Sequence, residues 1–389
     1  MKRLGVCVLY DAHGIVDGYV FKLIQSMQLM LERLFIVVNG SMREEFLEII
    51  KSYTQDIVIR DNCGMDGGAY KDIFTNYVTQ DSLQEYDEVV LFNDTFYGPF
   101  FPLTEIWKKA DREEGDFWGI TRHPEGEFPD GSKFISHIQS YFLVIRKSLL
   151  QTPCFMEFWK AISGNAINVE DVIKGFEIQF TSFFQEAGYR GFSLMERDEH
   201  FPEMKYNENP CMTHCSELIK RGISPFLKRK SFIIENEGFT DAFQACEYVR
   251  KHLQYPISLI EQNIRRLCRI HAWPSVWNYL DLEEFCKRHK KIYIYGKGLF
   301  GNQISQYFDY KGFKNYAFVV TEINGESQEN TLCYSEVSFR HGDGIILAMS
   351  RKNAVQVYQN IKGKFGDSQL FVPLDLRILI IQTKADRQV

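Results

Sequence analysis

The clearest candidate for chemistry is a carboxylate at the end of an apolar run. Val89 to Phe92 is a short β-prone segment typical of a buried strand, and it stops at Asn93, Asp94 and Thr95. In an open α/β sheet, ligands bind at the carboxyl ends of the strands, where loops vary over a rigid frame. The pattern therefore predicts Asp94 as a site residue between two hydrogen-bonding neighbours. The alternative is that these residues only open a turn before the Gly-Pro pair that follows.

Strands and helices alternate around this segment. Strands are predicted at 4–10, 34–38, 56–60, 89–92, 116–121 and 137–146, and helices at 17–33, 42–53, 103–110, 155–162 and 169–186. Such alternation predicts an α/β fold with a mostly parallel sheet and ligands at its carboxyl edge. Asp11 and Asn39 follow the first two strands, so we expect them at the same edge.

A glycine-rich segment follows the third predicted strand. It combines Asn62, Gly64 and Asp66 with two further glycines immediately before a helix. Glycines let backbone amides approach an anion, and a helix start adds a partial positive charge, so the segment could hold a phosphate or a ribose. Glycine richness alone, however, favours a plain tight turn.

Two further polar groups lie in apolar surroundings. Glu177 stands among aromatic and aliphatic residues on the last predicted helix. A solvated helix face is the usual explanation, but a partly desolvated carboxylate beside a sheet edge would be a competent general base. His137, Gln139 and Ser140 on the last strand could hydrogen-bond phosphate or sugar hydroxyls, and a packed, satisfied histidine is the alternative.

Length and composition bound the remaining possibilities. A chain of 389 residues predicts several domains, which we place at 1–206, 207–288 and 289–389. A net charge of −6 and a pI near 5.9 argue against a general nucleic-acid binder. The nine cysteines include no CxxC pair, which suits reduced thiols in a cytosol. Cys211, His214 and Cys215 are close in sequence, but no second ligand pair follows them, so we expect no metal there.

No targeting or membrane-spanning segment is expected. Lys2 and Arg3 precede an apolar run that ends at Tyr10, too soon for a signal peptide, and no stretch reaches about 20 apolar residues. These features predict a cytoplasmic protein.

The region 207–288 is predicted to be helical and more basic. Lys228 and its two basic neighbours could clamp a diphosphate, although a solvated loop is the simpler explanation. A helix at 257–270 has an apolar face and three arginines, which suits either an anionic membrane surface or, the reading we favour, packing between domains.

The motifs, taken together, resemble the rhamnan synthesis protein F family. They are YDAHGIVDGYV (10–20), NCGMDGGAYK (62–71), YDEVVLFNDTFYGPFFPL (86–103), DFWGIT (116–121), HIQSYFLVIRK (137–147) and FEIQFT (176–181). The resemblance covers residues 3 to 230, and the presence of six motifs in the same order makes it specific. It implies a bacterial cell-surface polysaccharide protein that transfers a sugar, often rhamnose, with a glycosyltransferase fold of the A type.

The resemblance also implies roles for particular residues. Asp94 would hold Mg²⁺ or Mn²⁺ on the donor diphosphate, and Glu177 would be the catalytic base. The donor site would be completed by Asp11, Asn39, Asn62, Gly64, Asp66, Asn93, Thr95, His137, Gln139 and Lys228. The usual Asp-x-Asp motif has become Asn93-Asp94-Thr95, which leaves one carboxylate there and metal dependence open.

The C-terminal region predicts a small Rossmann-like domain. Gly296, Gly298 and Gly301 fit a GxGxxG motif between a strand and a helix, and Glu322 ends the next strand, where a ribose-binding acid belongs. NAD or another nucleotide is the expected ligand. About ninety residues make only half a dinucleotide-binding fold, so we favour a regulatory or docking module.

The leading hypothesis is a glycosyltransferase that moves a sugar from a nucleotide-sugar donor to a glycan or lipid-linked acceptor, at the inner face of the cell membrane. A non-catalytic scaffold that binds a nucleotide sugar or NAD, and an NAD-dependent sugar-modifying enzyme, are the alternatives. The donor, the acceptor, the linkage and the existence of a homo-oligomer are not specified by the residues.

Overall fold

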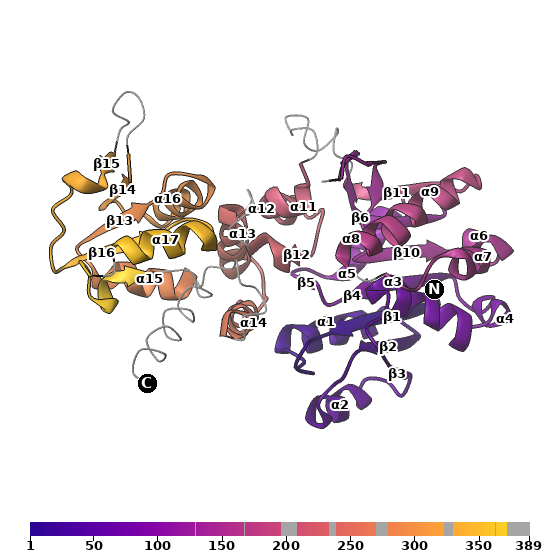
Figure 1. Ribbon diagram of the computed structural model, residues 1–389. Helices are drawn as coiled ribbons and strands as arrows, with labels where there is room; N and C mark the ends of the chain where they lie inside the picture. Colours follow the sequence, from indigo (N-terminus) through magenta and orange to yellow (C-terminus); the bar gives the residue numbers. More distant parts are fainter. Residues whose placement is uncertain are drawn as a thin grey trace, which may run out of the picture. The chain divides into compact units, whose positions relative to one another are not determined.

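The computed structural model describes residues 1–128, 130–166, 168–195, 208–232, 239–269, 279–322, 330–361 and 363–371 (Figure 1). The chain forms two compact units. The first comprises 1–229 and 245–260, and the second comprises 230–244 and 261–389. The helical region predicted at 207–288 is therefore divided between the two units.

The first unit is built on an eight-stranded sheet. Seven strands follow the order β11-β6-β10-β4-β1-β2-β3, and β9 pairs with β6. The strands are β1 (Arg3–Tyr10), β2 (Arg33–Asn39), β3 (Ile57–Arg60), β4 (Glu88–Asn93), β6 (Phe117–His123), β9 (His137–Ile138), β10 (Phe142–Arg146) and β11 (Gly191–Met195). The predicted α/β class with a mostly parallel sheet is confirmed, because within the seven-strand path only β10 runs antiparallel to its neighbours.

The strand predicted at 137–146 is broken in two. Both β9 and β10 pair with β6, and the residues between them form a corner in which the Gln139 amide donates to the Thr121 carbonyl at 3.0 Å. Phe142 of β10 lies opposite Phe92 of β4, so the corner stands beside the end of β4. Since β10 is antiparallel, its beginning lies at the carboxyl edge of the parallel strands.

Helices connect the strands of this unit and cover the sheet. They are α1 (Gly18–Gln28), α2 (Glu44–Lys51), α3 (Met65–Asp72), α4 (Gln80–Leu83), α5 (Leu103–Ala110), α6 (Lys147–Leu150), α7 (Pro153–Ala161), α8 (Val169–Val172) and α9 (Ile178–Glu186). Two π-helical turns, Ile73–Tyr77 and Ile173–Glu177, extend α3 and join α8 to α9. The region predicted as one helix from 169 to 186 is thus helical throughout.

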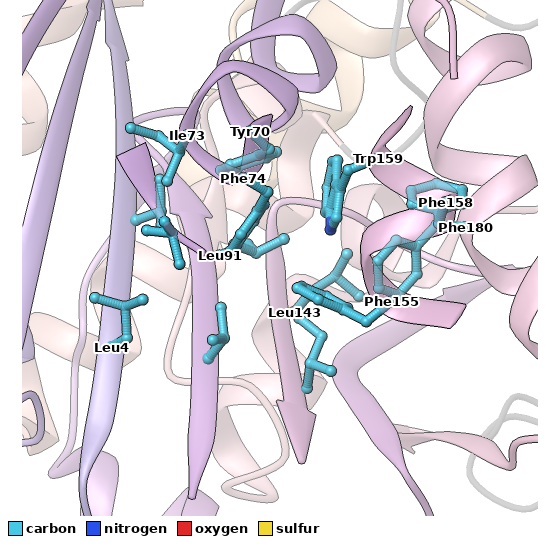
Figure 2. Close-up of a cluster of buried hydrophobic side chains, with 14 of the residues drawn as sticks. Leu4, Tyr70, Ile73, Phe74, Leu91, Leu143, Phe155, Phe158, Trp159 and Phe180 are labelled. Carbon is cyan, nitrogen blue, oxygen red and sulfur yellow. The ribbon is translucent and has the colours of Figure 1, made fainter. Parts of the chain in front are cut away.

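An aromatic core fills the space between the sheet and α3, α7 and α9. Figure 2 shows Tyr70, Phe74, Trp159, Phe155, Phe158 and Phe180 lying over Leu4, Leu91 and Leu143 of the strands. The Phe74 and Trp159 rings stack with centroids 4.9 Å apart. Each buried ring contributes roughly 1.5–3 kcal/mol of hydrophobic stabilisation, so the high aromatic content of the chain is largely structural.

The remaining elements of the first unit are short. They are β5 (Phe96–Tyr97), β7 (Gly126–Glu127), β8 (Lys133–Phe134), α11 (Pro210–Thr213), α12 (Cys215–Lys220) and β12 (Leu227–Lys228), with a 3-10 turn at Arg229–Phe232 that ends in the second unit. The important pairing is β12 with β5, antiparallel, because it joins residues about 130 positions apart in the chain. α13 (Phe239–His252) and α14 (Ser258–Arg269) each contribute residues to both units.

The second unit is a separate α/β domain. Its parallel sheet has the order β15-β14-β13-β16-β17, formed by β13 (Lys291–Tyr295), β14 (Tyr316–Val320), β15 (Thr331–Cys333), β16 (Asp343–Leu347) and β17 (Leu370–Phe371). The long helices are α15 (Tyr279–Arg288), α16 (Leu299–Lys311) and α17 (Arg351–Ile361), with 3-10 turns at Tyr334–Glu336 and Asp367–Gln369. In chain order the strands stand 3-2-1-4-5, which is the order of the first five strands of a Rossmann sheet.

The apolar face of α14 is buried. Ile260, Ile264 and Leu267 are at most 5% exposed, so these side chains are packed inside the protein. Among the described residues, no helix is both long enough and apolar enough to cross a membrane.

Candidate functional site

The predicted polar residues meet at the carboxyl edge of the first sheet. Asn93 ends β4, Asp94 follows it, and the corner between β9 and β10 brings Gln139 and Ser140 to the same edge. The acidic groups there interact electrostatically. Burial is the main cause of the raised pKa of Asp66, and the negative charges of Asp94 and Glu177 raise it further. Residues that the sequence analysis considered in separate segments therefore form one polar site.

Asp94 is buried with few hydrogen bonds to its carboxylate. The side chain is 9% exposed, and within the described residues its one hydrogen bond is a long 3.5 Å contact from the Tyr10 amide. Burial raises the pKa of Asp94, and the positive charge of Arg229 opposes that rise. A carboxylate that is desolvated and weakly bonded is available to a cationic ligand.

Asn93 links Asp94's strand to a second carboxylate. Its Oδ1 accepts hydrogen bonds from the Thr95 amide at 3.0 Å and the Thr95 hydroxyl at 2.6 Å, which fixes the orientation of the amide. Its Nδ2 therefore faces outward and donates to Asp66 Oδ2 at 2.7 Å. Burial and then the charge of Asp94 raise the pKa of Asp66 to about 6. Asp66 stands in the first turn of α3, so the glycine-rich segment does contribute to this edge.

Replacing Asp66 by Asn is expected to stabilise the protein by about 1–3 kcal/mol at pH 8. The folded-state pKa of about 6 exceeds the ordinary value of 3.8, so the ionised carboxylate costs folding free energy above pH 6. Below about pH 4 the carboxyl is protonated in both states and the difference should vanish. Urea unfolding at pH 4 and pH 8 measures this, and a variant less stable than wild type at pH 8 would contradict it.

A basic strand lies beside the two acids. β12 pairs with β5, and the Arg229 amide donates to the Thr95 carbonyl at 3.0 Å. The Lys228 ammonium lies 3.9 Å from the centre of the Tyr141 ring and 3.5 Å from the Thr95 hydroxyl. Both basic side chains are half-buried, so the solvated-loop explanation of this run is wrong for Lys228 and Arg229.

Arg229 and Tyr19 are site residues that sequence reasoning missed. Arg229 Nη1 donates to the Tyr19 hydroxyl at 2.7 Å, and that hydroxyl donates to the Asp94 carbonyl oxygen, also at 2.7 Å. Nearby negative and phenolic groups outweigh the effect of burial and raise the pKa of Arg229, so it stays charged. The basic run at 228–230 was the available signal, but only the β5–β12 pairing shows which cations face the site.

Glu177 accepts hydrogen bonds at both oxygens. The Ser140 amide donates to Oε2 at 2.7 Å, the Ser140 hydroxyl donates to the same oxygen, and His137 Nε2 lies 3.3 Å from Oε1. Burial alone would raise the pKa of Glu177, but His137 and the Ser140 donors outweigh it and lower the pKa to about 2. The hydrogen bonds stabilise the carboxylate and reverse the pKa shift that desolvation alone would produce, and the assignment of Glu177 as the catalytic base stays a prediction.

His137 faces an acceptor at each ring nitrogen. Nδ1 lies 2.8 Å from the Ile135 carbonyl oxygen, opposite the nitrogen that faces Glu177. The residue is 1% exposed, so both contacts are made inside the protein and hold the ring of His137 between the Ile135 carbonyl and Glu177.

Gln139 presents an oriented amide. Its Oε1 accepts from the Thr121 hydroxyl at 2.7 Å and from Cys211 Sγ at 3.1 Å, and Thr121 also contacts the Tyr141 hydroxyl at 2.9 Å. Two donors at the oxygen fix the amide nitrogen on the other side, where the described residues offer no acceptor. That N–H group could bind a ligand oxygen.

Three predicted donor-site residues have structural explanations, and a fourth, Asn62, makes no contact among the described residues that assigns it a role. Asp11 Oδ1 accepts the His13 and Ile15 amides at 2.9 and 3.2 Å, which closes the turn after β1. Asn39 Oδ1 accepts from Arg60 at 2.7 Å. Gly64 has φ of 71°, and a Cβ there would clash with the Gly164 carbonyl, so packing explains this glycine. Asn62 is half-buried and makes no hydrogen bond within the described part of the chain. Their donor-binding roles stay predictions.

Metal binding has limited support from protein ligands alone. Within the ranges that the structure describes, no three His, Cys, Asp or Glu side chains cluster as a metal site. Cys211 and Cys215 are buried, and His214 Nδ1 lies 2.9 Å from the Thr213 hydroxyl.

Fold and site together define an α/β protein whose sheet edge combines two acids with two cations. The rhamnan synthesis protein F family model matches residues 34–308, and the chain belongs to this family. An uncharacterized protein, y4gN, of Sinorhizobium fredii (strain NBRC 101917 / NGR234) is 25% identical over 202 residues. That match covers 49% of this chain and 48% of the relative, so the chain spans about half the length of the relative.

Similar solved structures are distant. One is a 4-diphosphocytidyl-2C-methyl-D-erythritol synthase from Anaerococcus prevotii DSM 20548, with 11% identity, TM-score 0.30, and coverage of 49% of this chain and 88% of that chain. Another is a nucleotide-diphospho-sugar transferase, described as putative, from Desulfovibrio desulfuricans G20, with 14% identity, TM-score 0.29, and coverage of 64% and 97%. Scores this low establish no shared fold, and the class of the sheet follows from its own strand order.

Proposed function

We propose that the first unit is a glycosyltransferase that moves a sugar, with rhamnose as the first candidate, from a nucleotide-sugar donor to a growing cell-surface polysaccharide or lipid-linked acceptor. Membership of the rhamnan synthesis protein F family supports this class of reaction. The observation that carries it is the sheet edge, where Asp94 and Asp66 lie beside Lys228 and Arg229. Work on a lipid-linked acceptor would place the protein at the inner face of the membrane.

The donor diphosphate needs positive charge as it departs. The anomeric carbon gains oxocarbenium character while its bond to phosphate lengthens, so negative charge develops on the leaving oxygen. Lys228 is the protein's cation for that charge, because its ammonium is fixed over Tyr141 and near Thr95. Arg229 donates a hydrogen bond to the Tyr19 hydroxyl, which in turn holds the backbone carbonyl of Asp94 in place.

Mg²⁺ or Mn²⁺ fits this site as a donor-bound ion. Asp94 offers a buried carboxylate whose one hydrogen bond among the described residues is long. Mg²⁺ sites of this kind use one or two carboxylates and take their other ligands from phosphates and water. Such an ion would supply charge neutralisation to the diphosphate when bound.

The incoming hydroxyl must lose its proton. A carboxyl with a pKa near the working pH is the better base, which favours Asp66 at about 6 over Glu177 at about 2. In our proposal Glu177 instead holds His137 and Ser140, and through them the corner that carries Gln139. The Gln139 amide then donates to a donor sugar or phosphate oxygen.

Transfer assays with the full chain test the proposal. UDP-, GDP- and dTDP-linked sugars, dTDP-rhamnose among them, would be offered with and without Mn²⁺, while calorimetry follows nucleotide binding. Release of nucleoside diphosphate together with labelled glycan supports the transferase. Tight nucleotide-sugar binding with no release in any mixture would favour the non-catalytic scaffold, and binding of no nucleotide sugar would refute both.

Lys228→Ala is expected to weaken binding of the nucleoside diphosphate about tenfold or more, because one charge-assisted contact is worth about 1.5–3 kcal/mol. Lys230→Ala is the matched control, since Lys230 belongs to the same basic run but is exposed. Calorimetry at two salt concentrations should show a weaker salt dependence for Lys228→Ala alone. Equal losses of affinity in Lys228→Ala and Lys230→Ala would mean that the basic run attracts the nucleotide only by nonspecific electrostatics.

A further inference from the structure

The second unit has a topological switch point at its sheet edge. β13 lies between β14 and β16, and the chain leaves β13 towards β14 through α16 but leaves β16 towards β17 through α17. Right-handed crossovers in opposite directions place the two helices on opposite faces. Both helices begin at the carboxyl edge, where open α/β sheets bind ligands in the crevice between the diverging connections.

The three glycines after β13 have different structural reasons. Gly296 has φ of 108°, and a Cβ there would lie 2.8 Å from the Ala348 carbonyl oxygen, so it makes the tight turn against the end of β16. At Gly301 a Cβ would clash with the Gly296 carbonyl, so this glycine lets α16 pack on the strand. Turn and helix packing thus account for the first and third glycines of the motif.

Neither backbone conformation nor packing within the protein requires a glycine at position 298. Its φ of −82° suits any residue, and a Cβ would meet nothing within 4 Å. The residue is exposed at the N-terminus of α16, a helix of 13 residues whose first amides lack intrahelical partners. The missing side chain leaves open space in front of those amides, which is the space that a pyrophosphate occupies at the second glycine of this motif.

Two polar residues follow neighbouring strands at this sheet edge. Glu322 lies two residues beyond β14 and is exposed, about 20 residues after the last glycine of the motif. Lys297, within the loop, donates to the Thr331 hydroxyl of β15 at 2.7 Å. An acid at the end of the second strand is where a ribose hydroxyl is bound in this fold.

We propose that the loop from Gly296 to Gly301 binds the pyrophosphate of a nucleoside diphosphate, with Glu322 accepting a hydrogen bond from its ribose. This site is independent of the proposed transferase site in the first unit. NAD and a nucleotide sugar share the pyrophosphate chemistry, and the experiment separates them. Under this proposal the second unit serves as a nucleotide sensor or a second substrate site.

Gly298→Ala provides a clean test, because the added methyl group meets no protein atom and only a ligand would be displaced. Hydrogen exchange of the full chain would be followed with NAD⁺, UDP, GDP and dTDP in turn. We expect at least one ligand to slow exchange across 296–301 in the wild type, and Gly298→Ala to weaken that ligand at least tenfold. Gly363→Ala, also open on its Cβ side, is the control and should behave as wild type.

The pattern of protection identifies the source of the ligand. Protection by NAD⁺ alone indicates a dinucleotide, and protection by UDP, GDP or dTDP indicates a nucleotide sugar. Protection confined to the first unit, or protection of 296–301 that survives Gly298→Ala unchanged, would overturn the proposal. Unfolding measured by circular dichroism should show both glycine variants folded, with a slightly lower midpoint for Gly298→Ala, because Gly298 is the N-cap of α16 and Ala is a poorer N-cap than Gly.

Discussion

Asp94→Asn should abolish sugar transfer, by at least about 10²–10³-fold, and leave folding intact. The carboxylate has one long hydrogen bond within the described residues, so its loss removes little native interaction. Burial raises its pKa, which means that the charged form is costly in the folded state and a neutral amide is tolerated. The backbone carbonyl that accepts from Tyr19 is unchanged by the substitution.

The measurement combines initial rates of transfer with thermal unfolding. Asp81→Asn is the matched control, because Asp81 is an exposed carboxylate on α4. We expect normal rates for Asp81→Asn, and lost rates with an unchanged unfolding midpoint for Asp94→Asn. Added Mn²⁺ should raise the affinity of wild type for nucleoside diphosphate more than that of Asp94→Asn. Wild-type turnover in Asp94→Asn would remove this residue from the mechanism.

Sequence patterns predicted the central part of this site because it depends on local chain order. A buried apolar run that ends in Asn93 and Asp94 must place them at a strand end, and the alternating elements put that end at the carboxyl edge of a parallel sheet. The Rossmann order of the second unit follows in the same way from strands and helices in sequence.

Long-range pairing was not predictable in this way. Lys228 and Arg229 reach the site because two residues of β12 pair with two residues of β5, a contact too short to leave a periodic pattern. The corner between β9 and β10 likewise depends on Glu177 and Thr181 of a distant helix, since Thr181 Oγ1 accepts the Ile138 amide at 3.1 Å. A single apolar run could not reveal that break.

The electrostatic environment of the buried carboxylates also could not be predicted from the sequence. The sequence shows that Glu177 stands among apolar residues, which by itself predicts a raised pKa. The direction reverses because three donors converge on its oxygens. Asp66 shows the opposite case, since its hydrogen bond from Asn93 does not offset burial and the charge of Asp94. The apolar neighbours of Glu177 in the sequence indicate that it is buried. Its hydrogen-bond donors, His137 and Ser140, come from β9 and the corner after it, about 40 residues earlier in the chain.

Glu177→Gln should lower transfer by at least about 10²-fold, while binding of free nucleoside diphosphate at Lys228 is kept. An amide keeps the shape of the carboxylate but places an N–H₂ group against either His137 or Ser140, both of which donate to Glu177. The corner carrying Gln139 then loses its position, although the nucleotide contacts at Lys228 and Asp94 remain.

Ser140→Ala separates a positioning role from direct base catalysis by Glu177. It removes one donor, so the pKa of Glu177 should rise from about 2, and a catalytic base would become stronger near neutral pH. We expect the reverse, a rate about tenfold below wild type, because the corner is less well held. The acid limb of the pH–rate profile should stay near pH 6, following Asp66, in wild type and in Ser140→Ala. A rate that rises in Ser140→Ala, with an acid limb that moves upward with it, would instead make Glu177 the base.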